Sequence, residues 1–168
     1  MSETAFRLYD EEAGSRFLSW WKSLEFASGD RASLRRARSL SELALISSFH
    51  RLRRDLGVTG DRQIEALAAA AVVLSNIRRH VPAKNGGFGG QLRGRLSDLR
   101  LRALLDADDP EEVMRRLPRA IALMDSAADV VAAARIAFGL SLESLRDRTR
   151  LRIAQDFYDA DTAIETSI

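Results

Sequence analysis

Apolar residues recur at intervals of three and four along almost the whole chain, which is the pattern of amphipathic α-helices. No segment alternates apolar and polar positions in the manner of a half-buried strand, and β-branched residues are sparse. The pattern therefore predicts an all-α protein, built as a two-lobed helical bundle.

Four helices are expected in the first half of the chain. In the first of them Phe17, Trp21 and Leu24 share one face, with Trp20 beside them. The fourth is apolar almost all round and rich in Ala, Val and Leu, so it is expected to be the buried central helix. The expected ranges are 10–26, 30–38, 39–55 and 61–80, with Asp30, Asp61 and the capping-box spacing of Ser39 and Glu42 as start signals, and Gly29, Gly57 and Pro82 as stops.

The stretch PAKNGGFGG has four glycines in its last five positions and is the clearest loop signal in the sequence. It divides the chain into an N-terminal lobe (1–81), a glycine-rich loop (82–90) and a C-terminal lobe (91–168). In the second lobe helices are expected at 97–107, from Asp109 onward, at 127–140 and at 141–160. Asp109-Pro110-Glu111-Glu112 is a strong helix start, and Pro118 is expected to kink or interrupt that helix.

Composition argues against most enzyme classes. The 168 residues include no cysteine, so a disulfide, a thiolate nucleophile and a cysteine-based zinc site are all excluded. His50 and His80 are the only histidines, and neither stands at metal-binding spacing from another ligand. The glycine-rich loop has neither the P-loop nor the dinucleotide-binding pattern, and no GxSxG occurs. We therefore expect no catalytic residues, no metal and no cofactor.

The N-terminus MSETAFRLYDEEAG is polar and acidic, unlike a secretory signal. The longest apolar run is short, alanine-rich and broken by polar residues, so it is not expected to span a bilayer. These features predict a cytoplasmic protein with no membrane partner.

Positive charge is concentrated in two segments, although the net charge is only +2. Residues 31–54 carry seven basic and one acidic side chain, and residues 78–102 carry the same numbers. Of the basic residues 24 are arginine and 2 are lysine, which suits phosphate recognition but also follows from a GC-rich genome. If the two segments meet in space, they form a surface that attracts a polyanion.

Within the first basic segment the arginines form stripes on their expected helices. Arg31, Arg35 and Arg38 fall on one side, and Arg51 and Arg54 lie opposite an apolar face. Only one acid, Glu42, is interspersed among residues 31–54, which favours polyanion contact over an ordinary solvated face. Arg78 and Arg79 can equally offset a helix dipole, and Trp20 and Trp21 are better explained as core than as base-stacking residues.

Four segments, WWKSLE, GDRASLRRARSLSELALISSFHRL, FGGQLRGRLSDLRLRALLDAD and LRIAQDFYD, together resemble in order and spacing the small subunit of the type I-E Cascade complex, the CasB family of CRISPR-associated proteins. The resemblance covers nearly the whole chain, but its motifs are helical patterns without a catalytic signature.

The resemblance implies an all-helical, two-lobed protein without enzymatic activity that packs as two copies along the backbone of an RNA-guided complex. The implied partners are the backbone and large Cascade subunits, a second copy of the chain, guide RNA, and target DNA including its displaced single strand. Cleavage would belong to a separate nuclease. Arg35 and Arg36 match the family's arginine pair, Arg62 a basic residue opening the central helix, and Arg100 the arginine of its S-x-x-R segment, while Arg119 falls near a further basic position.

Stabilising an opened duplex requires a basic track at phosphate spacing and no base readout. The residues expected to bind nucleic acid are Arg31, Arg35, Arg36, Arg38, Arg51, Arg54, Arg62, Arg78, Arg79, Lys84, Arg93, Arg95, Arg100 and Arg119. The alternative is a helical protein–protein adaptor whose arginine-rich face binds an acidic partner; a small helical enzyme is the least favoured reading.

Overall fold

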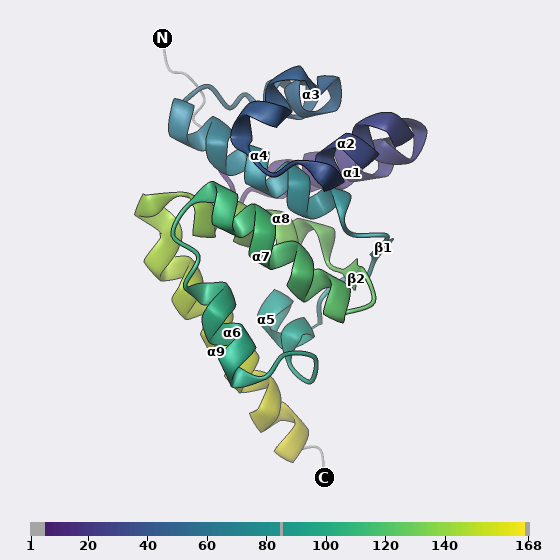
Figure 1. The fold of residues 1–168 in the computed structure, drawn as a ribbon. Coiled ribbons are helices and arrows are strands. Elements are labelled where there is room, and N and C mark those ends of the chain that lie inside the picture. Colours follow the sequence, from purple (N-terminus) through teal and green to yellow (C-terminus); the bar gives the residue numbers. More distant parts are fainter. Residues whose placement is uncertain (1–5, 85, 167–168) are drawn as a thin grey trace.

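The computed structural model describes residues 6–84 and 86–166, with side chains as far as residue 160. The buried helix expected at the centre is α4 (Asp61–Ser75), in which every residue from Ala66 onward is buried. Figure 1 shows the N-terminal helices α1 (Glu11–Ser23), α2 (Ser28–Arg36) and α3 (Ser47–Leu56) gathered at one end of the molecule. On its other side α4 packs against α7 (Pro110–Leu123) and α8 (Val130–Ser141).

The remaining elements extend away from α4. Helix α5 (Gly87–Leu92) packs on α9 (Glu143–Thr166), and α6 (Asp98–Leu105) packs on α7. In Figure 1 these helices lie on the side of the molecule opposite α1, α2 and α3. The described residues therefore form a mostly helical bundle, as predicted. One hydrophobic cluster runs through it from Leu8 to Phe157, on both sides of the boundary expected at 82–90. The division into lobes stays a prediction.

The central helix is shorter than predicted and ends at Ser75 instead of His80. The hydroxyl of Ser75 and the side-chain amide of Asn76 both donate to the carbonyl of Val72, at 2.6 and 2.8 Å. These local bonds compete with continuation of the backbone ladder. After the helix, β1 (Arg79–His80) pairs in parallel with β2 (Ala127–Ala128), a two-residue contact too short to leave an alternating pattern.

Three further expectations were wrong in detail. The helix expected at 39–55 is divided into a 3₁₀-helix, η2 (Leu40–Leu45), and α3, with Ile46 extended between them. Another 3₁₀-helix, η1 (Leu24–Phe26), continues α1. Asp30 does not cap its own helix: its carboxylate accepts the backbone N–H of Ser48, at 2.9 Å, in the first turn of α3. Asp61 is the first residue of α4, and Gly60 occupies the cap position.

The glycine-rich segment is only partly a loop, because α5 begins at Gly87. Gly86 has a φ of 103°, a conformation that favours glycine. Gly89 is packed so closely on α9 that an added Cβ would overlap the carbonyl oxygen of Ile153. The glycines therefore permit a turn and a close contact between helices. Glycine content alone cannot distinguish these roles from those of a flexible loop.

The start of α7 is confirmed. Asp109 accepts the N–H of Glu112 at 2.8 Å, and Glu112 accepts the N–H of Asp108, also at 2.8 Å. Pro118 does not interrupt the helix, which continues to Leu123. Trp20 is buried and donates to the carbonyl of Ser48 at 2.8 Å, so its role as core is confirmed.

Candidate nucleic-acid interface

Four arginines surround one hollow between α2 and α7. The hollow has a volume of about 300 Å³ and is lined by Arg35 of α2, Arg38 just after it, and Arg115 and Arg119 of α7. All four side chains are exposed. Two segments separated by some 80 residues in the sequence thus place guanidinium groups around one concave surface.

Helix geometry and one anchoring bond explain this convergence. Arg115 and Arg119 are four residues apart, so they lie on the same face of α7. The carboxylate of Glu111, one turn earlier, accepts the backbone N–H of Leu40 at 3.2 Å. This bond holds the segment after α2 against the start of α7.

The hollow is electrostatically one-sided. Among the described residues, no carboxylate lies within ion-pair distance of Arg35, Arg38, Arg115 or Arg119. The other residues that line this hollow are uncharged, among them Asn76 and Pro118. Such a cluster of like charges is costly unless water or an anion screens it, so it favours binding of a polyanion.

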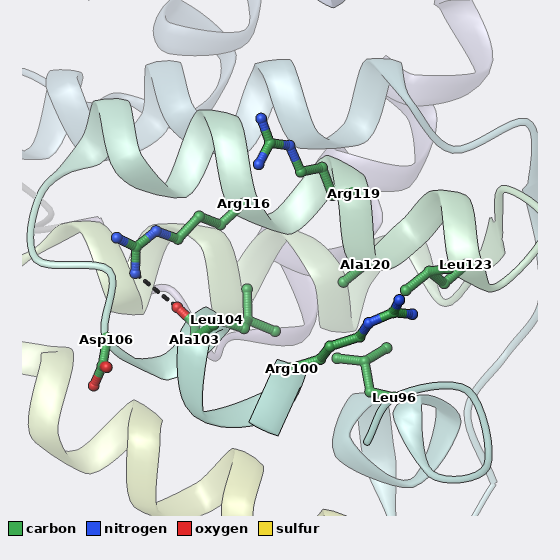
Figure 2. A pocket seen from close by; sticks show the side chains of 9 residues that line it. All are labelled: Leu96, Arg100, Ala103, Leu104, Asp106, Arg116, Arg119, Ala120 and Leu123. Atoms are coloured by element: carbon green, nitrogen blue, oxygen red, sulfur yellow. Dashed lines mark hydrogen bonds between the residues drawn. The ribbon is translucent and has the colours of Figure 1, made fainter. Parts of the chain in front are cut away.

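A second, larger hollow lies on the other side of α7, against α6 (Figure 2). Its volume is about 660 Å³, and its lining includes Arg100, Arg116 and Arg119 above an apolar floor. Arg116 is held in place, because it donates to the carbonyl of Ala103 at 2.7 Å and lies 3.5 Å from the carboxylate of Glu112. Arg100 extends toward Leu123 in Figure 2.

Arg119 lines both hollows and therefore connects them across α7. We name the resulting set of six side chains the α7 track; its members are Arg35, Arg38, Arg100, Arg115, Arg116 and Arg119.

Arg31 supports the track from inside the fold. It is half-buried and donates to the carbonyls of Ser75 at 3.4 Å and Ile77 at 2.8 Å. The pKa of Arg31 is lowered, first by burial and then by the neighbouring charges of Arg35 and Arg78, while Glu25 opposes the shift. Its guanidinium is thus engaged with the end of α4, and its charge adds to the positive potential at Arg35.

Arg51, Arg54 and Arg62 lie elsewhere. Arg51 donates to the hydroxyl of Ser23 at 2.6 Å, on the side of α3 that faces α1. Arg54 lines a hollow that also contains the acids Asp10, Glu12 and Asp55. Arg62 is in the first turn of α4, and a rise of 1.5 Å per residue puts it about 20 Å along the axis from the end of that helix, where the track begins. The structure does not bring these three arginines to the track.

The second basic segment is partly neutralised. Arg79 and Arg95 line a hollow of about 230 Å³ together with Asp125, whose carboxylate lies 3.3 Å from Arg95. Arg93 lies 3.7 Å from Asp98 and 4.7 Å from the centre of the Phe157 ring. Arg78 and Lys84 are exposed, and so is Arg36 of the first basic segment. Of the predicted residues from this segment, Arg100 alone belongs to the track.

Arg115 and Arg116 were missed from the sequence, because residues 103–134 carry three basic and seven acidic side chains and so look acidic. A signal was present: Arg115, Arg116 and Arg119 are all the basic residues of that segment and fall within two helical turns. The acids of the segment stand mostly before α7 or in its first turn, where they cap it.

Among the side chains described, those of residues 6–84 and 86–160, no group of three or more histidine or acidic residues could hold a metal ion. His50 Nε2 lies 2.8 Å from the carbonyl of Ala44, and His80 Nδ1 accepts the N–H of Val130 at 3.1 Å. In the same part of the chain no helix combines the length and apolar character needed to cross a membrane.

Two comparisons relate the chain to known proteins. Residues 30–158 match the model of the family described as CRISPR-associated protein Cse2. The fold is similar to a chain in the crystal structure of E. coli Cascade bound to a PAM-containing dsDNA target with a 32-nt spacer, at a TM-score of 0.67 and 26% identity over 90% of this chain and 99% of that one. No individual curated protein sequence matches significantly.

Proposed function

Since the chain belongs to the CRISPR-associated protein Cse2 family, we propose that it is a non-catalytic subunit of an RNA-guided DNA-surveillance complex in the cytoplasm. In this role it holds the sugar–phosphate backbone of the displaced DNA strand and of the guide–target region, and thereby stabilises the opened duplex during antiviral defence. Its partners are the backbone and large subunits of the complex, a second copy of itself, guide RNA and target DNA.

The observation that carries this proposal is the α7 track. Six arginines from three elements line two adjoining hollows, and Arg119 belongs to both. A phosphate chain needs regularly placed cations and no fixed base partners, and arginine offers each phosphate a rigid fork of donors. The E. coli relative is a component of a complex that holds target DNA, which supports the same assignment.

A small number of protein–phosphate contacts is enough to stabilise the opened duplex. Forming the guide–target hybrid exchanges one set of base pairs for another of similar stability, so a few backbone contacts tip the balance. The track supplies such contacts without reading the sequence.

The salt dependence of binding to single-stranded oligodeoxythymidylate tests the proposal. Each arginine that contacts a phosphate contributes about 0.7 to the slope of log K against log salt, so Arg35→Ala, Arg100→Ala and Arg119→Ala should each lower it by about that amount. Arg148→Ala is the matched control, because Arg148 is exposed on α9 and has no hydrogen-bond or ion-pair partner among the described residues.

Wild-type slopes in all three track variants would contradict the proposal. Binding of an acidic protein in place of the oligonucleotide, abolished by the same substitutions, would favour the adaptor alternative.

A further inference from the structure

We propose that the hollow between α6 and α7 is a pocket for one unpaired nucleobase of the strand that follows the α7 track; this inference rests on the proposed function. The hollow holds about 660 Å³, which is within the range of roughly 300–1,000 Å³ typical of small-molecule sites. The hollow on the α2 side is about 300 Å³ and is lined by four arginines. The two halves of the track therefore differ in chemistry.

The floor of the larger hollow is apolar. It is formed by Leu96, Leu104 and Ala120, which are almost fully buried, and by Leu123, which is 39% exposed. A phosphate gains nothing from such a floor, because burying its charge against leucine is unfavourable. The flat face of a nucleobase does gain, because it leaves water for apolar contact.

The rim of the hollow fits the rest of a nucleotide. Arg100 of α6 and Arg119 of α7 both line the hollow, so each can take one of the two phosphates that flank a base. A guanidinium plane also stacks on base faces. Asp106 is the one carboxylate among the lining residues, and in Figure 2 it points away from both arginines.

The observations favour a nucleic-acid strand over an acidic peptide as the occupant. The positive surface does not end at the rim but continues past Arg119 to Arg115, Arg35 and Arg38. Charge at every step along a path of this kind complements a sugar–phosphate chain, whose negative charges repeat at each nucleotide.

The experiment compares two strands of equal length, oligodeoxythymidylate and an oligomer in which abasic sites replace every base. Both carry the same phosphates, so the ratio of their dissociation constants isolates the contribution of the bases. We expect wild type to bind the base-bearing strand at least about fivefold more tightly, the lower end of measured base-stacking contributions.

Leu123→Asn should remove most of this preference while leaving the salt slope unchanged. The control is Leu99→Asn, since Leu99 is a leucine of α6 that is 74% exposed, against 39% for Leu123, and does not line the hollow. A second variant, Ala103→Gln, fills the hollow from an exposed position and should give the same loss as Leu123→Asn.

Equal affinity for the two strands with a normal salt slope would overturn the base pocket and leave the track intact. Failure of the arginine variants to change the slope would instead overturn the proposed function. A Leu123→Asn variant that keeps the base preference but loses association with a protein subunit would assign the hollow to a protein segment and refute the inference.

Discussion

The guanidinium of Arg31 donates a hydrogen bond of 2.8 Å to the backbone carbonyl of Ile77. The indole N–H of Trp21 donates to the same carbonyl at 2.9 Å, so residues from α1 and α2 both satisfy the backbone just after α4. Helices leave their last carbonyls without intrahelical partners, and Arg31 also donates to one of these, the carbonyl of Ser75, at 3.4 Å. The end of α4 is thereby fixed beside Asn76, which lines the hollow of the α7 track.

Arg31→Ala should lower the free energy of unfolding by about 1–3 kcal/mol, because it leaves two carbonyls without a charged donor. Arg31→Lys should recover part of that loss, since a single ammonium cannot reproduce the fork. Urea denaturation measures both. The exposed Arg36→Ala is the control and should stay within about 0.5 kcal/mol of wild type. An Arg31→Ala protein of unchanged stability but reduced salt slope would show that Arg31 contacts phosphate instead.

Gly89→Ala should destabilise the protein by about 1–3 kcal/mol, the usual cost of overpacking, because the new methyl group would overlap the backbone of Ile153 and the side chain of Asp156. Gly29→Ala is the contrast. Gly29 lies in α2 with no atom near its missing Cβ, so alanine there should be neutral or stabilise by up to about 1 kcal/mol. Thermal melting compares the two, and equal shifts would show that α5 does not pack on α9 as described.

Asp125→Asn should strengthen binding to single-stranded DNA. The carboxylate of Asp125 neutralises Arg95 and faces the hollow that Arg79 also lines. If the freed Arg95 engages a phosphate, the salt slope should rise by about 0.7. Loss of the exposed ion pair itself should cost less than about 1 kcal/mol of stability. An unchanged slope would mean that this hollow lies away from the path of the strand.

Asp156→Asn should stabilise the protein increasingly as pH rises. Burial raises the pKa of Asp156, with Arg152 opposing the shift and Asp159 adding to it. The folded protein therefore holds this proton at pH values where the unfolded chain, with a pKa near the ordinary 3.8, has lost it, so wild-type stability falls through that interval and stays reduced above it. Urea unfolding at several pH values measures the difference, and parallel stability curves for the two proteins would contradict it.

Local signals in the sequence predicted the helices well where those signals act alone. Asp109, Pro110 and Glu112 begin a helix by contacts within four residues, and the structure has that helix where it was expected. The prediction was wrong where a distant partner decides. Asp30 caps a helix 18 residues away. The end of α4, 5 residues before the expected position, follows instead from the local bonds of Ser75 and Asn76 to the carbonyl of Val72, which the apolar pattern did not signal.

The site followed the same rule. The clustering of positive charge along the chain identified Arg35, Arg38 and Arg100 as candidate binding residues. It did not indicate which arginines lie next to one another in the fold. That depends on where α7 lies between α2 and α6, which no spacing in the sequence encodes. Arg119 was reached through family resemblance alone, and Arg115 and Arg116 were hidden among the acids that cap their own helix.

Five of the six track arginines are carried by α-helices on which the rest of the fold packs, and only Arg38 and the tips of the side chains are free of that frame. Because the helices are already rigid, the backbone of the protein loses little conformational entropy on binding. The entropy cost of binding comes mainly from ordering the nucleic-acid strand and the arginine side chains. A single copy in isolation should consequently bind and release a strand quickly. When it is assembled beside other sites for the same strand, the effective concentration of the strand at each site rises, and the residence time of the strand increases many-fold.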